Sequence, residues 1–377
     1  MPIAAPKEWV YPSYPRFTPT LLRYHPHPST FAIPIVEIER LPPSTKETLM
    51  PNPWTGKGNP YTRQEVRDRL QDTLDADKAI IAAGAGAGIS AKFIERGGAD
   101  LLIIYNSGRF RMAGRGSTAG LMAYGDANQI AMEIGEFEVL PVVEEIPVIC
   151  GVHASDPRRR MWHWLLQVKD MGFSGVNNFP THCIVDGHFR QVLEETGMSF
   201  DAEVEMVGLA HKMDLFSVVY VATPQEAAAM AQAGADAIIA HVGTTIGGTI
   251  GVTGAVCSMD DAAARCQAIF EGAAAVRDDV FFLAHGGPIN TPDDAAHINR
   301  VTDAVGFVGA SSLERMAIEE SLTEAGARLH HTEGTHNSGW MLMDFGDVIV
   351  HVMGPEERDF YRIEGAWSEA QEVVRIQ

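Results

Sequence analysis

Cysteine is scarce in this chain. The 377 residues contain four, and none forms a close pair with another: Cys150, Cys183, Cys257 and Cys266. This spacing argues against a zinc site or a disulfide framework. Isolated thiols are typical of a reducing compartment, and the N-terminus lacks the basic and then apolar pattern of a secretory signal. We therefore expect reduced cysteines in a cytoplasmic protein.

Positive charge and long apolar runs are also lacking. Lys and Arg number 29 against 49 Asp and Glu, which gives a formal net charge of -20. This acidic excess disfavours binding to nucleic acid or to an anionic membrane. No apolar stretch reaches the roughly 18 to 20 residues of a membrane span. We expect neither partner, and we expect local arginine clusters to hold a small anion.

Proline is sparse except near the N-terminus, where residues 1–53 hold 12 of the 21 prolines. That density blocks helices and central strands, so it predicts an extended arm. Five interleaved aromatic residues favour an arm that lies against the body or a neighbouring subunit: Trp9, Tyr11, Tyr14, Phe17 and Tyr24. A disordered segment is the alternative.

Residues 54–322 show a regular alternation of short apolar runs and amphipathic segments. The first amphipathic segment follows Thr62, a suitable helix cap. The eight apolar runs are AIIAAGAG, ADLLIIYNS, PVICGVHASD, SGVNNFP, LFSVVYVAT, DAIIAHVG, VFFLAHGGP and AVGFVGASS. They lack polar alternation, which is typical of parallel strands buried on both faces. The pattern predicts an α/β fold, a (β/α)8 TIM barrel, with a doubly wound open sheet as the alternative.

Barrel enzymes build their sites at the carboxyl ends of the strands, and here two of those ends are rich in glycine. The seventh run leads into Gly286 and Gly287, and the eighth into Gly309, Ser311 and Ser312. Such turns, followed by a helix start, predict a phosphate-binding cup. Glycines that only permit tight turns are the alternative. A flavin phosphate is a second possible occupant of such a cup.

The first and second strand ends differ in kind. The GAGAG run at 84–88 lacks the acidic partner of a dinucleotide fingerprint at the next strand end, so we expect small residues that leave room for a ligand. The second strand opens into a loop with Arg109, Arg111 and Arg115. Guanidinium groups can clamp a carboxylate or phosphate. Contacts to backbone carbonyls or interface carboxylates are the alternative.

Histidines at other strand ends are candidates for proton transfer. His153, His241 and His285 would meet at one barrel mouth, and imidazole titrates near neutral pH. Asn106 and Asn177 could hold a carbonyl oxygen or stabilise an oxyanion. A structural role is the alternative for each lone histidine.

Metal binding has weaker support in the sequence. Asp156 and Glu205, with Asn106, could offer oxygen atoms to Mg²⁺, but no fixed spacing joins them. Glu205 falls in the amphipathic segment before the fifth strand, where a solvated helix face is an equal alternative. The sequence therefore does not identify the cofactor, and Mg²⁺ is the candidate metal.

Several long blocks in order resemble one known family. They cover residues 83–128, 172–181, 193–212, 285–295 and 306–315, and together they are similar to the phosphoenolpyruvate hydrolase-like TIM-barrel family over about residues 53–322. The resemblance implies a homo-oligomeric barrel that acts on a small phosphorylated or 2-oxo-carboxylate compound by hydrolase or lyase chemistry. The carboxylate and lysine motifs of phosphonopyruvate and isocitrate-lyase relatives are not recognisable here.

The alternation of apolar runs and amphipathic segments does not continue into residues 323–377. These residues predict a small α+β fragment with two strands around a turn at 345–347. The blocks at 338–352 and 355–361 resemble the C-terminal half of the ribosomal silencing factor family, whose members bind the large ribosomal subunit. Because the first half of that small domain is missing, we expect an oligomerisation or packing module rather than a ribosome-binding one. A non-catalytic scaffold with such a tail is the alternative to the enzyme.

Overall fold

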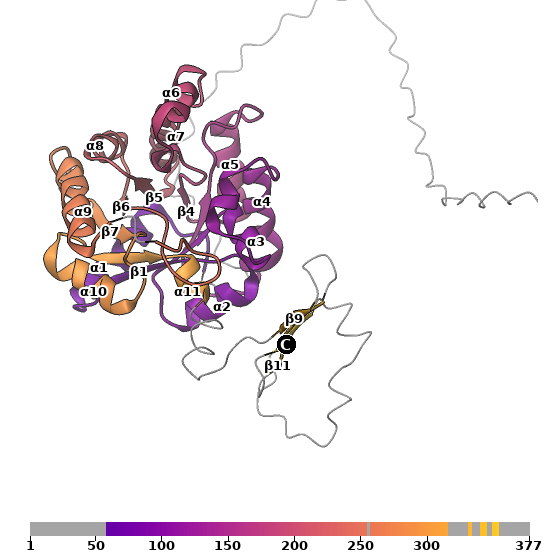
Figure 1. Ribbon diagram of the computed structural model, residues 1–377. Helices are drawn as coiled ribbons and strands as arrows, with labels where there is room; N and C mark the ends of the chain where they lie inside the picture. The colour runs from indigo at the N-terminus through magenta and orange to yellow at the C-terminus, as the bar shows by residue number, and fades with distance from the viewer. Residues whose placement is uncertain (1–57, 255–256, 316–330, 334–339, 345–348, 354–377) are drawn as a thin grey trace, which may run out of the picture. The chain divides into compact units, whose positions relative to one another are not determined.

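A computed structural model describes residues 58–254, 257–315, 331–333, 340–344 and 349–353. The expected N-terminal arm and the expected turn at 345–347 lie outside the described residues. Within them, eight parallel strands close into a barrel in sequence order, β1 to β8, and β8 pairs with β1. Helices surround the barrel (Figure 1). The predicted TIM barrel is confirmed, and the open-sheet alternative is excluded.

The barrel strands coincide with the eight apolar runs. They are β1 Ile80–Gly84, β2 Leu101–Ile104, β3 Val148–Gly151, β4 Gly175–Asn177, β5 Phe216–Val221, β6 Ala237–His241, β7 Phe281–His285 and β8 Gly306–Gly309. Most of their residues are fully buried, as expected for strands that contact helices on one face and the barrel interior on the other.

The helices fill the segments between the strands. The α-helices are α1 Arg63–Asp75, α2 Gly88–Arg96, α3 Asn106–Met112, α4 Ala127–Glu133, α5 Met161–Met171, α6 Gly187–Glu195, α7 Phe200–Lys212, α8 Pro224–Ala233, α9 Met259–Ala274, α10 Pro292–Val301 and α11 Ser311–Arg315. The shorter helical turns are η1 Ser117–Leu121, η2 Ile134–Val139, which is a π-helix, and η3 His182–Ile184. Within the described residues, no helix is long and apolar enough to cross a membrane.

A separate three-stranded antiparallel sheet belongs to the C-terminal part of the chain. It contains β9 His331–Glu333, β10 Trp340–Asp344 and β11 Ile349–Met353, in the order β11-β10-β9. Trp340 pairs with Met353 and Asp344 with Ile349. The two strands expected from the sequence are therefore present, and β9 is a third that the sequence analysis did not identify.

The glycines of the GAGAG run make room for protein atoms. A Cβ on Gly84 would lie 2.7 Å from the Tyr105 hydroxyl oxygen, and one on Gly151 would lie 2.5 Å from the Tyr105 Cβ. A Cβ on Gly86 would lie 2.3 Å from the carbonyl oxygen of Gly108. The Tyr105 ring and the backbone of α3 therefore occupy part of the space that was expected to hold a ligand.

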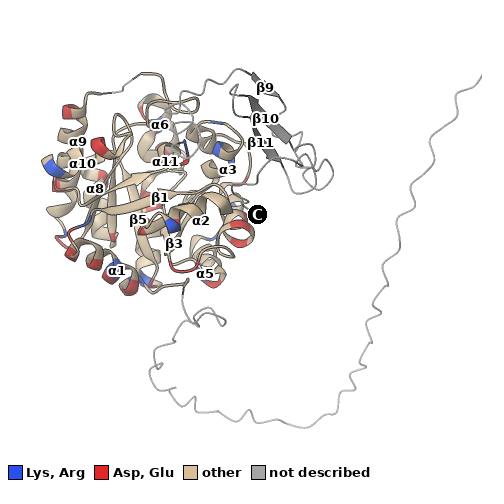
Figure 2. Cartoon of the chain, turned by 90° about the horizontal axis from the view of Figure 1, so that it is seen from below, with Lys and Arg blue, Asp and Glu red and all other residues tan. Residues whose placement is uncertain are grey.

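Helix α1 is tied to the amino-terminal side of the barrel by one buried carboxylate. Thr62 caps the helix with a reciprocal bond to Glu65, as expected. Arg63 and Arg67 then reach the fully buried Asp236, with nitrogen to oxygen distances of 2.7 and 2.8 Å. The Ser217 amide donates to the same carboxylate at 3.0 Å. Acidic and basic residues otherwise lie mostly on the outer surfaces of the helices (Figure 2).

Replacing Asp236 with Asn should lower the free energy of unfolding by about 3 kcal/mol, because breaking a buried ion pair leaves its charged partners uncompensated. Urea denaturation of both proteins measures the difference. Asp279→Asn is the matched control, since the Asp279 carboxylate also pairs with Arg67 but is 56% exposed. It should lose less than about 1 kcal/mol. Equal losses in the two variants would contradict this account of how α1 is held.

Candidate active site

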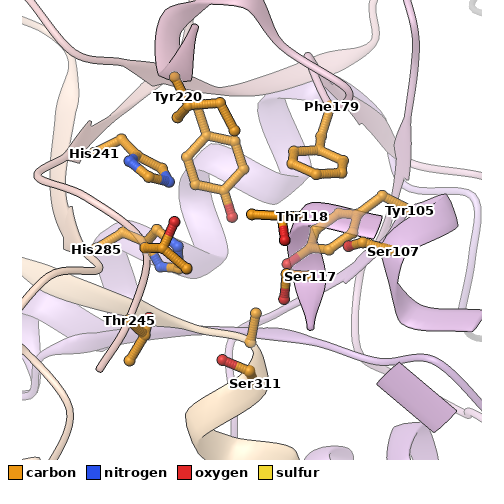
Figure 3. A pocket seen from close by; sticks show the side chains of 13 residues that line it. Tyr105, Ser107, Ser117, Thr118, Phe179, Tyr220, His241, Thr245, His285 and Ser311 are labelled. Atoms are coloured by element: carbon orange, nitrogen blue, oxygen red, sulfur yellow. The ribbon is translucent and has the colours of Figure 1, made fainter. Parts of the chain in front are cut away.

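A small pocket lies at the carboxyl ends of the barrel strands (Figure 3). Its cavity volume is about 40 Å³, so only a small ligand fits. Six hydroxyl side chains other than tyrosine line it, with two tyrosines, two histidines and three apolar residues: Ser107, Ser117, Thr118, Thr244, Thr245, Ser311, Tyr105, Tyr220, His241, His285, Phe179, Ile184 and Ala310. No lining side chain carries a fixed charge.

His241 and His285 end β6 and β7 in adjacent register, and their ring centroids are 5.1 Å apart. His285 Nδ1 lies 2.7 Å from the carbonyl oxygen of Val308. A carbonyl only accepts, so this nitrogen carries the proton and Nε2 has the lone pair. The Gly243 amide donates to Nδ1 of His241 at 3.3 Å, so the neutral His241 ring carries its proton on Nε2. The backbone thus selects opposite tautomers in the two rings.

Burial keeps both imidazoles neutral. It lowers the pKa of His285 to about 4, with a smaller contribution in the same direction from the charge of Arg111, while the bond to Val308 raises it. Burial also lowers the pKa of His241 well below 6.5, and the neighbouring His285 adds to that effect. Because both pKa values lie below 7, a lone pair and an N–H group are both present in the pocket at neutral pH.

Two tyrosines complete the inner wall. The Tyr220 ring lies 5.6 Å from the His241 ring and 5.1 Å from the His285 ring, measured between centroids. Its hydroxyl is hydrogen-bonded to Tyr105, and burial raises its pKa well above 10. Tyr220 is therefore a neutral phenol. Figure 3 shows its hydroxyl directed between the histidines and Tyr105.

Of the three predicted arginines, only Arg111 is buried. Its side chain donates from Nε to Glu314 at 2.5 Å and from Nη1 to Ser107 at 3.0 Å, while Nη2 is buried without a partner among the described residues. Arg109 is 42% exposed and pairs with Glu138, and Arg115 is exposed. The expected open arginine loop is corrected here: Asn106–Met112 forms α3, and the helix directs successive arginines to different sides.

The expected cup after β7 and β8 is also built differently. The Gly287 amide donates to the Gly243 carbonyl at 2.9 Å, and a Cβ on Gly286 would lie 2.1 Å from that same oxygen. These glycines hold the loop after β6. A Cβ on Gly309 would meet Leu313 at 2.5 Å. Ser311 does line the pocket, whereas the neighbouring Ser312 is buried and is not one of the lining residues.

The other sequence candidates lie outside the pocket lining. Asn106 donates to the Gly120 carbonyl and Asn177 to the Val218 carbonyl, at 2.8 and 2.7 Å. The carbonyl oxygen of each amide is buried without a partner among the described residues. His153 is half-buried, with Nδ1 at 3.4 Å from the Pro180 carbonyl. The structure therefore brings together His241, His285 and Ser311, with Arg111 behind Ser107.

The predicted oxygen donors for Mg²⁺ do not form a site. Asp156 is held by Arg158, Arg159 and Asn128, and these bonds lower its pKa to about 2 although burial opposes the shift. Glu205 is exposed on α7. Among the described residues, no group of three or more His, Cys, Asp or Glu side chains could hold a metal ion. These donors therefore do not fit a bound metal ion.

Sequence reasoning missed Tyr220 and the lining serines and threonines other than Ser311. Tyr220 stands near the end of the fifth apolar run, so strand alternation could have placed its ring inside the barrel beside the histidines. Threonines and serines in short segments after the strands carry no such signal.

Glu203 has a structural role beside the pocket. It is buried and accepts hydrogen bonds from Asn178, Thr181 and His182. It fixes the loop that places Phe179 in the pocket wall.

Comparison with known proteins gives two family matches. A family model described as phosphoenolpyruvate hydrolase-like matches residues 65–331. A second model, described as ribosomal silencing factor during starvation, matches residues 314–377. Both resemblances noted in the sequence are confirmed by these matches.

Each alignment with an individual relative covers only part of this chain and only part of the relative. The ToMV resistance protein Tm-1(GCR237) of Solanum lycopersicum is 51% identical over 262 residues, 69% of this chain and 34% of that protein. The ribosomal silencing factor RsfS of Chromobacterium violaceum is 45% identical over 51 residues, 14% of this chain and 42% of that protein. The chain thus spans about a third of the length of the tomato relative.

A solved structure of phosphonopyruvate hydrolase in complex with oxalate and Mg²⁺ is similar with a TM-score of 0.44 and 15% sequence identity. The similar part covers 69% of this chain and 88% of the phosphonopyruvate hydrolase chain.

The buried neutral His285 should make stability depend on pH. Its folded pKa of about 4 lies below the ordinary value of 6.5, so the unfolded chain binds the extra proton first as pH falls. The stabilisation is complete above pH 6.5 and is lost between there and about pH 4. We expect His285 to account for about 2 kcal/mol of lost stability between pH 6.5 and about pH 5.

Urea denaturation of the wild type and of His285→Asn at the two pH values measures how much of the lost stability is due to His285. The variant should lose about 2 kcal/mol less than the wild type over the same interval. Identical losses in the two proteins would show that His285 is not the group that titrates.

Proposed function

The chain belongs to the phosphoenolpyruvate hydrolase-like family, and from this premise we propose that its barrel is an enzyme acting on small 2-oxo-carboxylate compounds. The reaction class is hydrolase or lyase chemistry, with proton transfer by His241 and His285. The observation that carries the proposal is the pair of opposite tautomers fixed by Val308 and Gly243 in one small pocket. A base and an acid that stand side by side are what such chemistry requires.

The roles follow from the atoms. Nε2 of His285 has the lone pair and would take a proton from a carbon next to a carbonyl group or from an attacking hydroxyl. Negative charge then develops on the carbonyl oxygen. The Nε2–H group of His241 and the Tyr220 hydroxyl are neutral donors that can bind this oxygen, as an oxyanion hole does. Since both donors are already fixed in place, they need little reorganisation during the reaction.

The charge of the pocket favours a 2-oxo-carboxylate over a phosphorylated compound. A buried dianion needs compensating charge, and no lining side chain supplies it. The buried cation behind Ser107, Arg111, is already paired with Glu314 through Nε. Its free Nη2 group suits one carboxylate. An incoming carboxylate also raises the pKa of His285 toward neutrality, which would make it a stronger base.

Proton exchange on pyruvate tests the proposed chemistry directly. In D2O the protein should exchange the methyl protons of pyruvate for deuterium, because an enolate forms whenever His285 removes a proton. Proton NMR measures the rate. His285→Asn should lower it by about 10²- to 10⁴-fold, the usual contribution of a general base.

The matched control for this assay is His211→Asn. His211 also faces a backbone carbonyl through Nδ1, but it lies near the end of α7 and is not one of the pocket-lining residues. Its exchange rate should equal that of the wild type. If the wild-type protein exchanges no protons above the buffer rate, the acid–base proposal is wrong for pyruvate and its analogues.

Arg111→Lys should weaken pyruvate binding by about tenfold or more, the value of a charge-assisted hydrogen bond. Lysine keeps a positive charge beside Glu314 but cannot reproduce Nη2. Calorimetric titration measures the dissociation constant, and inorganic phosphate should bind weakly or not at all to either protein. Arg109→Lys, which alters only the half-exposed pair with Glu138, should leave pyruvate binding unchanged. Equal weakening in both variants would contradict an Arg111 subsite.

The match of residues 314–377 to a ribosomal silencing factor supports a second candidate, a non-catalytic scaffold with an interaction tail. In that case the histidine variants would alter stability alone, and neither pyruvate nor phosphate would bind the barrel.

A further inference from the structure

The segment that follows β6 reaches across the carboxyl end of the barrel. Its described part is residues 243–254, which we call the β6 loop. In a closed barrel of eight strands, β2 lies opposite β6. Yet a Cβ on Gly116, in the segment that follows β2 and α3, would lie 2.9 Å from the carbonyl oxygen of Ile250. The backbone of the β6 loop therefore meets the segment from the opposite side of the barrel mouth.

Both ends of this crossing contribute to the pocket wall. Thr244 and Thr245 begin the β6 loop, and Ser117 and Thr118 follow Gly116; all four line the pocket. Figure 3 shows Thr245 on the side of the histidines, and Ser117 and Thr118 on the side of Tyr105. His285 is only 8% exposed. The β6 loop therefore covers the pocket on the side where a ligand must enter.

Backbone hydrogen bonds fold the β6 loop back on itself. The Gly247 amide donates to the Val252 carbonyl at 3.0 Å, and the Val252 amide donates to the Thr245 carbonyl at 3.3 Å. These two bonds make the loop one unit. At its base, the Ile246 amide donates to the carbonyl of Gly287, after β7, at 3.2 Å. A movement of the whole unit must break this last bond, whereas it keeps the two internal ones.

Little of this unit is buried. Of residues 243–254, Thr245 alone is buried, and segments with few buried groups open at low free energy. Gly243, at the start of the loop, has a φ of 132°, and Gly247 and Gly248 have φ values of 91° and 65°. Glycine adopts such values without steric cost, and hinges absorb their φ changes at a few positions of this kind. The β6 loop thus has pivots and little burial to hold it shut.

We propose that the β6 loop is a lid, which opens to admit a ligand and closes against Gly116 to exclude water from the pocket. Closure replaces water around the histidines with fixed protein groups. Gly116 has a φ of -65°, which any residue adopts, so the close approach of Ile250 is what requires glycine there. This inference goes beyond the proposed reaction and does not depend on which reaction occurs in the pocket.

Carbethoxylation of His285 by diethyl pyrocarbonate tests the lid in the full chain. The reagent attacks the lone pair of a neutral imidazole, so it must enter the pocket to reach this ring. Peptide mass spectrometry measures the rate, and the exposed His188 is the internal reference for the reagent. In the wild type, His285 should react at least about tenfold more slowly than His188, because only the fraction of molecules with an open lid admits the reagent.

Gly116→Ala should hold the lid open, because the added methyl group presses on the Ile250 carbonyl oxygen and overpacking of a close contact is costly. His285 should then react about tenfold faster, the effect of about 1.4 kcal/mol. Deletion of residues 248–250 removes the part of the lid nearest to Gly116 and should give at least the same increase. Gly254→Ala is the matched control within the loop, since no described atom beyond its chain neighbours lies within 4 Å of the added Cβ. It should react as the wild type does.

Circular dichroism should show that every variant is folded. A wild-type His285 that reacts as fast as His188 would overturn the lid, because the pocket would then be open already. Equal rates for His285 in the wild type, in Gly116→Ala and in the deletion variant would also overturn it, as would the same increase in Gly254→Ala. None of these rates depends on turnover, so a failure of the lid and a failure of the proposed reaction are separate outcomes.

Discussion

The buried ion pair between Arg111 and Glu314 is the contact on which the barrel mouth depends. Arg111 belongs to α3, after β2, and Glu314 to α11, after β8. The second carboxylate oxygen of Glu314 accepts the Gly86 amide, after β1, at 2.7 Å. One carboxylate thus joins the ends of three adjacent strands, and Arg111 passes the constraint to Ser107 in the pocket wall. Because a buried charge is costly without its partner, these loops must form together.

That pairing also sets the electrostatic character of the pocket. A free guanidinium would make it a strong anion site, but Glu314 compensates the charge, and only Nη2 has no partner among the described residues. Among the described residues that line the pocket there is no carboxylate beside the histidines, and burial keeps them neutral. Elsewhere the chain does pair a buried histidine with an acid, as His182 with Glu203 at 2.8 Å. The two histidines of the pocket thus differ from His182 in that burial, and not a carboxylate, determines their charge.

The fold could be predicted from the sequence because it depends on patterns of burial. Eight apolar runs became eight strands, and His241 and His285 fell at strand ends as expected. The direction of individual side chains in the loops could not be predicted in this way. Whether Arg109 or Arg111 faces the interior depends on α3, a helix of one to two turns, and the Gly287 amide faces Gly243 because of a tertiary contact. The serines and threonines that line the pocket come from short helical segments and a loop after the strands, which carry no periodic signal.

The two family matches overlap at residues 314–331, and the contacts at the start of this overlap indicate where the barrel ends. Glu314 is bonded to Arg111 and Gly86, and Arg315 donates to the Asn290 side chain, after β7, at 2.9 Å. Both residues are thus held by barrel loops. The barrel therefore extends at least to Arg315.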